Sequence, residues 1–222
     1  HLAYANSAAF VAADIPPDVE NPPGAEFVRD ADGNLNGVMK NNVAFGQVLF
    51  RYPAVAEADP VAALLNLAAR FNQVGLTTAS EFSLGPADLE VLNATAATGK
   101  LTTRIRAYPF YTYDAAWDEM ALQPQTGDAI ARIAGYKLVS DGSNQGYTGL
   151  QREPYLNTDN YGLAYTEPEE LTRLAAKRSQ QGWQLAIHGN GDRAIDNVLD
   201  ALETVQATGI DVRSLRPRIE HC

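Results

Sequence analysis

Apolar and polar positions follow two alternating periods from about residue 58 onward. Helical spacing of apolar residues predicts helices over residues 60–72, 86–98, 167–181 and 193–208, and over part of 114–133. Short apolar or alternating runs between them predict strands at 76–80, 102–108, 136–141, 184–188 and 217–221. Strands and helices in regular succession are typical of an α/β protein with a parallel sheet.

The predicted strands recur at intervals of a kind found in barrels. An eight-unit barrel of about 250 residues implies roughly 30 residues per unit. Only the interval between the third and fourth predicted strands is clearly longer, because residues 142–166 are inserted there. We therefore predict a partial (β/α)8 TIM barrel containing about strands 2 to 6, with at least one earlier strand and two later strands absent.

The first 57 residues have a different pattern. Two Pro-rich turns, at residues 14–18 and 21–24, precede an Asp32-Gly33 turn that stands between two short runs. An Asp-Gly pair in this position is a strong β-hairpin signal. We predict two domains, a loop and β-hairpin insertion over residues 1–57 and the partial barrel over 58–222.

Composition and charge exclude some classes of partner. The chain is 45% hydrophobic and 20% charged, which is ordinary for a globular protein, and its net charge of −10 disfavours nucleic acid. No apolar run approaches the roughly 20 residues of a membrane span, and no signal peptide opens the chain. The single cysteine, Cys222, leaves a cytoplasmic and a periplasmic location equally open.

Candidate chemistry lies at the ends of three predicted strands. His188 and His221 each end a strand, and neighbouring parallel strands lie about 4.8 Å apart, so both imidazoles can reach one metal ion. Alternatively, each histidine only forms hydrogen bonds at its strand end. Lys137 lies inside a strand and is costly to bury as a cation. It either pairs with Asp141 or Glu220, or reacts with carbon dioxide to form a metal-bridging carbamate.

Three separated motifs resemble the amidohydrolase superfamily. They are Gly135-Tyr136-Lys137-Leu138-Val139-Ser140-Asp141-Gly142-Ser143, Ala186-Ile187-His188-Gly189-Asn190-Gly191-Asp192, and Arg216-Pro217-Arg218-Ile219-Glu220-His221-Cys222. They are most similar to amidohydrolase family 3, the group of N-substituted formamide deformylase-like proteins. The segment from His1 to Val38 also resembles that group, so the resemblance covers nearly the whole chain.

The resemblance implies a role for each matching residue. Lys137 matches a fourth-strand lysine that is carried as a carbamate, and His188 and His221 match metal-binding histidines of the fifth and sixth strands. His1 and Asn6 match an insertion that helps to wall the substrate pocket. The family's His-x-His on the first strand and its Asp on the eighth strand have no counterpart here, which indicates a segment of a longer enzyme.

The predicted function is hydrolysis of C–N bonds other than peptide bonds in a small amide, formamide or cyclic amide, with a divalent metal, zinc above all, activating water. The covering loop 142–166 supplies Tyr147 as a substrate-binding residue, and Asp141 is assigned there because it shares a face with Lys137. The isolated segment is expected to bind metal weakly, to lack activity, and to self-associate or belong to a longer chain. A phosphoesterase-type metal barrel and a non-catalytic segment that binds a ligand or partner remain alternatives.

Overall fold

The computed structural model describes residues 2–22, 25–52, 55 and 57–222. Two compact units divide the chain, residues 1–59 and residues 60–222. Each unit has its own hydrophobic core, so each is described by itself.

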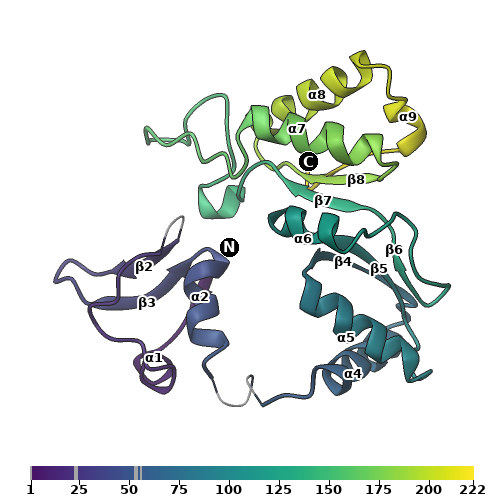
Figure 1. The fold of residues 1–222 in the computed structure, drawn as a ribbon. Helices are drawn as coiled ribbons and strands as arrows, with labels where there is room; N and C mark the ends of the chain where they lie inside the picture. The colour runs from purple at the N-terminus through teal and green to yellow at the C-terminus, as the bar shows by residue number, and fades with distance from the viewer. Residues whose placement is uncertain (1, 23–24, 53–54, 56) are drawn as a thin grey trace. The chain divides into compact units, whose positions relative to one another are not determined.

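The N-terminal unit contains a three-stranded antiparallel sheet with the order β1-β3-β2 (Figure 1). Strands β2 (Glu26–Arg29) and β3 (Leu35–Lys40) form the predicted hairpin, and Gly33 adopts φ +84° in its turn. Strand β1 (Leu2–Tyr4) pairs with the other edge of β3. The unit is therefore more regular than a loop and hairpin, because a three-residue strand is too short to show a period in the sequence.

Two helices complete the core of this unit. Helix α1 (Ser7–Ala12) buries Phe10, which meets Phe27 of β2 edge to face with ring centroids 6.4 Å apart. Helix α2 (Asn42–Leu49) contributes Ala44, which has no exposed surface. The N-terminal unit thus stabilises itself through a small core of its own.

The second unit is an α/β fold with parallel sheets. One sheet has the order β4-β5-β6, formed by Thr78–Leu84, Arg104–Pro109 and Ala131–Ile133, and the other has the order β7-β8-β9, formed by Tyr136–Val139, Leu185–His188 and Arg218–Glu220. A parallel bridge between Phe110 and Lys137 joins the two sheets. The five predicted strands are all present and follow one another in chain order.

Helix α6 (Asp114–Glu119) covers part of the range 114–133, as predicted, and strand β6 occupies the end of that range. The helix is short, and the Asp128 carboxylate accepts the backbone N–H groups of Ile130 and Ala131 at 2.7 and 2.9 Å, which favours a turn over a helix. Two residues separate the end of β6 from the start of β7. Ala134 N donates to Ala107 O of β5, whereas Tyr136 N donates to Gln184 O beside β8, both at 2.8 Å. β6 and β7 therefore occupy one place in the strand order, between β5 and β8, as two segments separated by a bend.

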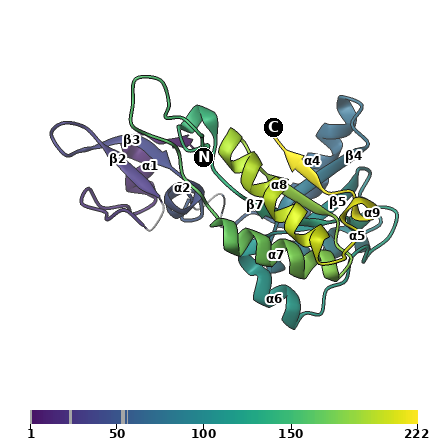
Figure 2. The same ribbon diagram turned by 90° about the horizontal axis from the view of Figure 1, so that it is seen from above.

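Five helices in the described part of the second unit pack on its sheet. They are α4 (Pro60–Gln73), α5 (Pro86–Ala97), α7 (Pro168–Gln180), α8 (Asp192–Ala207) and the short α9 (Val212–Leu215). Helices α7 and α8 lie side by side in both views (Figure 1 and Figure 2). Their Leu171, Leu174, Val198 and Val205 belong to a core that also contains Leu138 and Ile187 of the sheet. No helix in the described ranges is long and apolar enough to span a membrane.

The sheet of this unit is strongly curved. In a flat sheet, β4 and β9 would be separated by four strand spacings, or about 19 Å. Yet the Arg218 guanidinium of β9 lies 5.5 Å from the ring centroid of Phe82 in β4, and equally far from that of Tyr108 in β5. Side chains of the outermost strands therefore meet on the concave face.

A buried arginine connects α7 to α6 and to the beginning of β7. Arg178 is 2% exposed, and its guanidinium donates to the Asp114 and Asp118 carboxylates and to Gln181 Oε1. It also stacks on the Tyr136 ring at 4.5 Å from the centroid, and the Tyr136 hydroxyl donates to Asp114 Oδ1 at 2.7 Å. This cluster, which we call the Arg178 cluster, anchors the strand residue that precedes Lys137.

Candidate active site

Lys137 lies inside the curved sheet with its amine away from water. Lys137 is 4% exposed. Its Nζ is one of the buried polar atoms that have no hydrogen-bond partner in the described part of the chain. Nζ lies 5.5 Å from the centre of the Phe82 ring. Burial lowers the pKa of Lys137 to about 8, the Glu220 carboxylate opposes this shift, and the Arg218 guanidinium adds to it. The predicted salt bridge of Lys137 to Asp141 or Glu220 is not formed among the described ion pairs.

Strand register places Lys137 and His188 on the same face of the sheet. Val139 pairs with His188, and alternation puts Lys137, two residues before Val139, on the same side. The His188 and His221 rings meet edge to face with centroids 4.5 Å apart. Burial lowers the pKa of both histidines, and the nearby Lys137 charge lowers the pKa of each further. All three predicted ligands therefore lie within electrostatic reach of one another.

The contacts of His188 favour one of its tautomers. Nε2 lies 2.5 Å from the Gly142 carbonyl oxygen, which can only accept a hydrogen bond. The Asn190 side-chain amide also donates to that oxygen, at 2.8 Å. The Gly142 contact favours the tautomer with the proton on Nε2 and the lone pair on Nδ1, and Asn190 Nδ2 lies 3.1 Å from the same Nε2. Metal-binding histidines are oriented in this way, by donating their second ring N–H to a carbonyl or a carboxylate.

His221 completes the group beyond the end of β9. His221 is exposed and adopts φ +77°. This left-handed backbone conformation is uncommon for residues other than glycine. This turn of the backbone follows Glu220, whose carbonyl accepts the Gly189 N–H at 3.2 Å. The end of β9 is thereby fastened to the turn that follows His188.

Asp141 was predicted to contact the substrate, but its side chain is enclosed by the protein. It has no exposed surface, and its carboxylate accepts backbone N–H groups from Leu150, Asn190 and Gly191 at 2.8 to 2.9 Å. Its Oδ1 lies 3.5 Å from His188 Nε2. A carboxylate enclosed in this way faces the protein backbone, and a substrate could not reach it without displacing these bonds.

The inserted loop 142–166 lies at the end of the sheet that holds His188, as predicted. Asn144 Nδ2 donates to Asn190 O at 3.2 Å, and Arg152 forms an ion pair with Asp196 of α8. Apart from the single 3-10 turn Asn144–Gly146, the loop is irregular. Tyr147 is 59% exposed and packs on Tyr155 with ring centroids 5.2 Å apart. Its exposure leaves it accessible to a ligand.

Gly191 is required for the close approach of this loop to the turn after His188. A Cβ at Gly191 would overlap the Leu150 carbonyl group, whereas a Cβ at Gly189 would meet Ile219 Cγ2 at an ordinary 3.4 Å. We expect Gly191→Ala to lower the free energy of unfolding by about 2 kcal/mol, because backbone atoms cannot move aside as a flexible side chain can. The matched variant Gly189→Ala should change it far less. Urea unfolding measures both variants. Equal losses of unfolding free energy in Gly191→Ala and Gly189→Ala would contradict this account.

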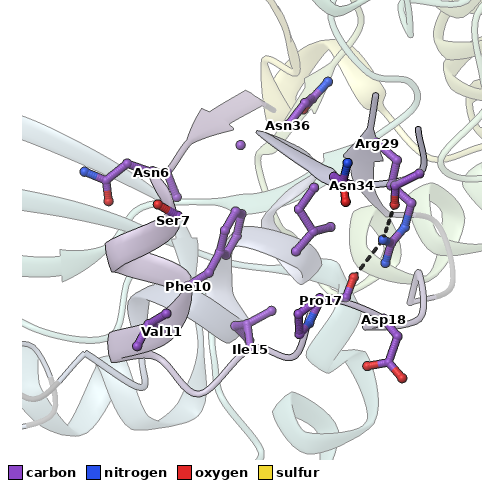
Figure 3. A pocket seen from close by; sticks show the side chains of 14 residues that line it. Asn6, Ser7, Phe10, Val11, Ile15, Pro17, Asp18, Arg29, Asn34 and Asn36 are labelled. Carbon is purple, nitrogen blue, oxygen red and sulfur yellow. Dashed lines mark hydrogen bonds between the residues drawn. The ribbon is translucent and has the colours of Figure 1, made fainter. Parts of the chain in front are cut away.

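His1 and Asn6 belong to the N-terminal unit. His1 lies outside the described residues. Asn6 caps helix α1, its Oδ1 accepting the Ala9 N–H at 2.9 Å, and it lines a cavity of about 560 Å³ (Figure 3). Arg29 also lines this cavity, but its guanidinium donates to the carbonyls of Pro17, Gly33 and Val19. Asn6 therefore has a structural role in this unit.

The residues of the second unit fit part of a divalent-metal site. Among the described residues, no three His, Cys, Asp or Glu side chains lie close enough together to hold an ion. Lys137 becomes an anionic ligand only after its amine has reacted with carbon dioxide, and its unpartnered Nζ fits that change. Together with two adjacent imidazoles it would supply three protein ligands, the usual number in an open zinc site.

Sequence reasoning missed residues that contact these candidate ligands. Phe82 under the Lys137 amine, Asn190 beside His188 and the Gly142 carbonyl were not singled out for these contacts. Asn190 stands two residues after His188, and Gly142 directly follows Asp141. Their proximity in the motifs was a signal, but only the turn geometry shows which atoms meet.

Curated relatives match this chain over nearly all of its length. Protein LONG AFTER FAR-RED 3 of Arabidopsis thaliana is 28% identical and covers 100% of the chain. The putative amidohydrolase YtcJ of Bacillus subtilis is 28% identical over 91% of the chain, and an N-substituted formamide deformylase of Arthrobacter pascens is 26% identical over 93%. The chain spans only 40%, 39% and 40% of these relatives' own lengths.

The fold and the family agree with these matches. A crystal structure of an uncharacterized metal-dependent hydrolase from Pyrococcus horikoshii OT3 superposes with a TM-score of 0.70 at 24% identity, covering 99% of this chain and 46% of the other. At that identity the likeness concerns the fold alone. The family model described as "Amidohydrolase family" matches residues 1–222. The chain therefore belongs to the amidohydrolase family.

Proposed function

We propose that this chain is part of a metal-dependent hydrolase that cleaves C–N bonds other than peptide bonds in small amides, formamides or cyclic amides. The observation that carries the proposal is the buried, unpartnered Lys137 amine on the same face as His188, beside the His188–His221 pair. The formamide deformylase among the relatives supports this substrate class.

We further propose that the second unit is a segment of a (β/α)8 barrel. Five parallel strand positions in chain order support this, as does a curvature that brings Arg218 of β9 over Phe82 of β4. The complete enzyme would then contain strands beyond these residues, in keeping with the 40% share of the relatives' lengths. A strand before β4 and strands after β9 would supply the remaining ligands, and the proton-accepting carboxylate would come from one of the later strands.

Each residue has a defined part in this proposal. The neutral Lys137 amine adds to carbon dioxide and releases one proton to water, which gives a carbamate whose single negative charge is shared by two oxygens. Burial favours the neutral amine that this reaction needs. His188 presents the Nδ1 lone pair, His221 lies at the exposed mouth, and Tyr147 contacts the substrate. What a divalent ion, zinc in our proposal, supplies at such a site is a bound water of lowered pKa and a polarised substrate carbonyl.

Hydrolysis assays on two lengths of chain test this function. We expect these 222 residues alone to release no measurable formate from an N-substituted formamide with zinc and bicarbonate present, because part of the ligand set is missing. The longer reading frame that contains them should be active, and His188→Ala should reduce kcat/KM by about 10³-fold or more, as expected for loss of a group that supports metal catalysis.

The exposed Arg173→Ala is the control in the longer protein, since among the described residues Arg173 forms an ion pair only with Glu170, also of α7. Its activity should match that of the unaltered protein. A longer protein that hydrolyses the formamide equally well with Ala at position 188 would contradict the proposed function.

A further inference from the structure

We propose that Asp141 is a positioning residue of His188, whose carboxylate fixes the two backbone segments that hold the His188 ring in one tautomer and orientation. The inference deepens the proposed function, because it rests on His188 being a metal ligand. It assigns to Asp141 a role in the site that involves no contact with substrate.

The Asp141 carboxylate joins two segments that are far apart in the sequence. Oδ1 accepts the Asn190 N–H at 2.9 Å, and Oδ2 accepts the N–H groups of Leu150 and Gly191, both at 2.8 Å. One segment is the inserted loop and the other is the turn after His188. Hydrogen bonds to an ionised, fully buried carboxylate are among the strong ones in proteins.

Each segment has a residue in contact with the His188 ring. Gly142, the residue after Asp141, places its carbonyl 2.5 Å from Nε2. Asn190, whose backbone is held by Asp141, donates its side-chain amide to that same carbonyl. Asp141 Oδ1 itself lies 3.5 Å from Nε2. The carboxylate thus holds the proton acceptor of His188 and adds a negative charge beside it.

The alternative is that Asp141 only ties the loop to the turn. Loss of the carboxylate would then lower stability without changing the protonated nitrogen of His188. In the positioning role, the same loss allows the proton to move from Nε2 to Nδ1, the atom that would bind the metal. The tautomer of His188 therefore distinguishes the two roles, and it can be read without any metal.

The test is two-bond ¹H–¹⁵N correlation NMR of the chain labelled with [¹⁵N]histidine, in which only three histidines give signals. We expect His188 in the unaltered chain to be protonated at Nε2. In Asp141→Asn, whose amide nitrogen cannot accept a hydrogen bond, the Nδ1-protonated form should increase by about fivefold or more.

The matched control is Asp128→Asn. The Asp128 carboxylate also accepts two backbone N–H groups, from Ile130 and Ala131, but it belongs to the turn before β6. This variant should leave the His188 signals unchanged. A folded Asp141→Asn chain whose His188 spectrum equals those of the unaltered chain and the control would overturn the proposal.

A second measurement applies if Asp141→Asn does not fold, as judged by the near-UV signal of the buried Trp117 and Trp183. The amides of Leu150, Asn190 and Gly191 in the unaltered chain should then exchange slowly with solvent, and His188 should be protonated at Nε2. Fast exchange of these amides, or an Nδ1-protonated His188, would overturn the proposal.

A Co²⁺ titration separates this inference from the proposed function. If Asp141 positions a metal ligand, Asp141→Asn should weaken Co²⁺ binding about 10- to 100-fold, as with other partners of metal-bound histidines. A tautomer change in Asp141→Asn without any Co²⁺ binding by the unaltered chain would confirm the positioning role and contradict the metal site. Co²⁺ binding by the unaltered chain, with an unchanged tautomer in Asp141→Asn, would support the metal site and contradict the positioning role.

Discussion

Replacing Arg178 with alanine is expected to lower the free energy of unfolding by about 3 to 5 kcal/mol, the range for removing one partner of a buried ion pair. Arg178 is 2% exposed and donates to Asp114 through Nε and to Asp118 through Nη1. Without the guanidinium, the largely buried Asp114 loses a charged partner, and the Tyr136 ring loses its stacking contact. Urea unfolding monitored by tryptophan fluorescence measures this loss.

The same helix provides the control for that variant. Arg173 forms an ion pair with Glu170, but the two side chains are 56% and 48% exposed. Exposed pairs of this kind contribute about 0 to 1 kcal/mol, so Arg173→Ala should have a small effect. Similar losses for Arg173→Ala and Arg178→Ala would show that the Arg178 cluster does not anchor α6, α7 and β7 as the structure indicates.

Replacing Lys137 with methionine is expected to stabilise the chain and to abolish its metal binding. The folded-state pKa of Lys137 is about 8, below the ordinary 10.5, so the folded chain holds this proton less tightly than the unfolded chain. The difference corresponds to roughly 3 kcal/mol of destabilisation, since one pKa unit is about 1.4 kcal/mol. Methionine has a similar length and removes the buried charge, so unfolding below pH 8 should require up to about 3 kcal/mol more.

The pH dependence gives this prediction its sign. Below pH 8 the lysine is protonated in both states, and the full cost is present. Between pH 8 and 10.5 the folded chain has lost the proton while the unfolded chain retains it, so the stability of the unaltered chain rises with pH. The gain from Lys137→Met should therefore shrink toward zero over this range.

The exposed Lys100→Met controls for the loss of a lysine as such. Unfolding curves of the unaltered chain, Lys137→Met and Lys100→Met at pH 7 and pH 10 measure how the gain in stability depends on pH. A Lys137→Met gain that is the same at both values, or a loss of stability at pH 7, would contradict the buried-amine account.

The sequence predicted the elements whose pattern is local. All five strand positions from β4 to β9 and the long helices α4, α5, α7 and α8 follow from periodicity and from Pro and Gly at their ends. Lys137 and the two histidines could be grouped because parallel strands bring their carboxyl ends to one edge. Strands β1 and β6 were missed because three residues are too few to show a period and neither follows a predicted helix at the regular interval, as the equally short β9 does.

Contacts between distant segments could not be predicted in this way. The Arg178 cluster joins residues of α6, β7 and α7 that are separated by up to 64 positions in the chain. Asp141 was assigned to substrate because its face is shared with Lys137, but the inserted loop and the turn after His188 enclose its carboxylate. Alternation gives the face of a side chain, and the course of the neighbouring loops decides whether that face is open.

Anomalous diffraction at the zinc edge tests the central claim most directly, that Lys137, His188 and His221 face one metal-binding mouth. In crystals of the chain grown with millimolar zinc and bicarbonate, we predict a peak bonded to His188 and His221 at zinc–nitrogen distances of about 2.0 to 2.1 Å, next to Lys137. The peak should vanish in crystals of His188→Ala. Zinc bound elsewhere on the chain, with the two imidazoles free of metal, would contradict the account.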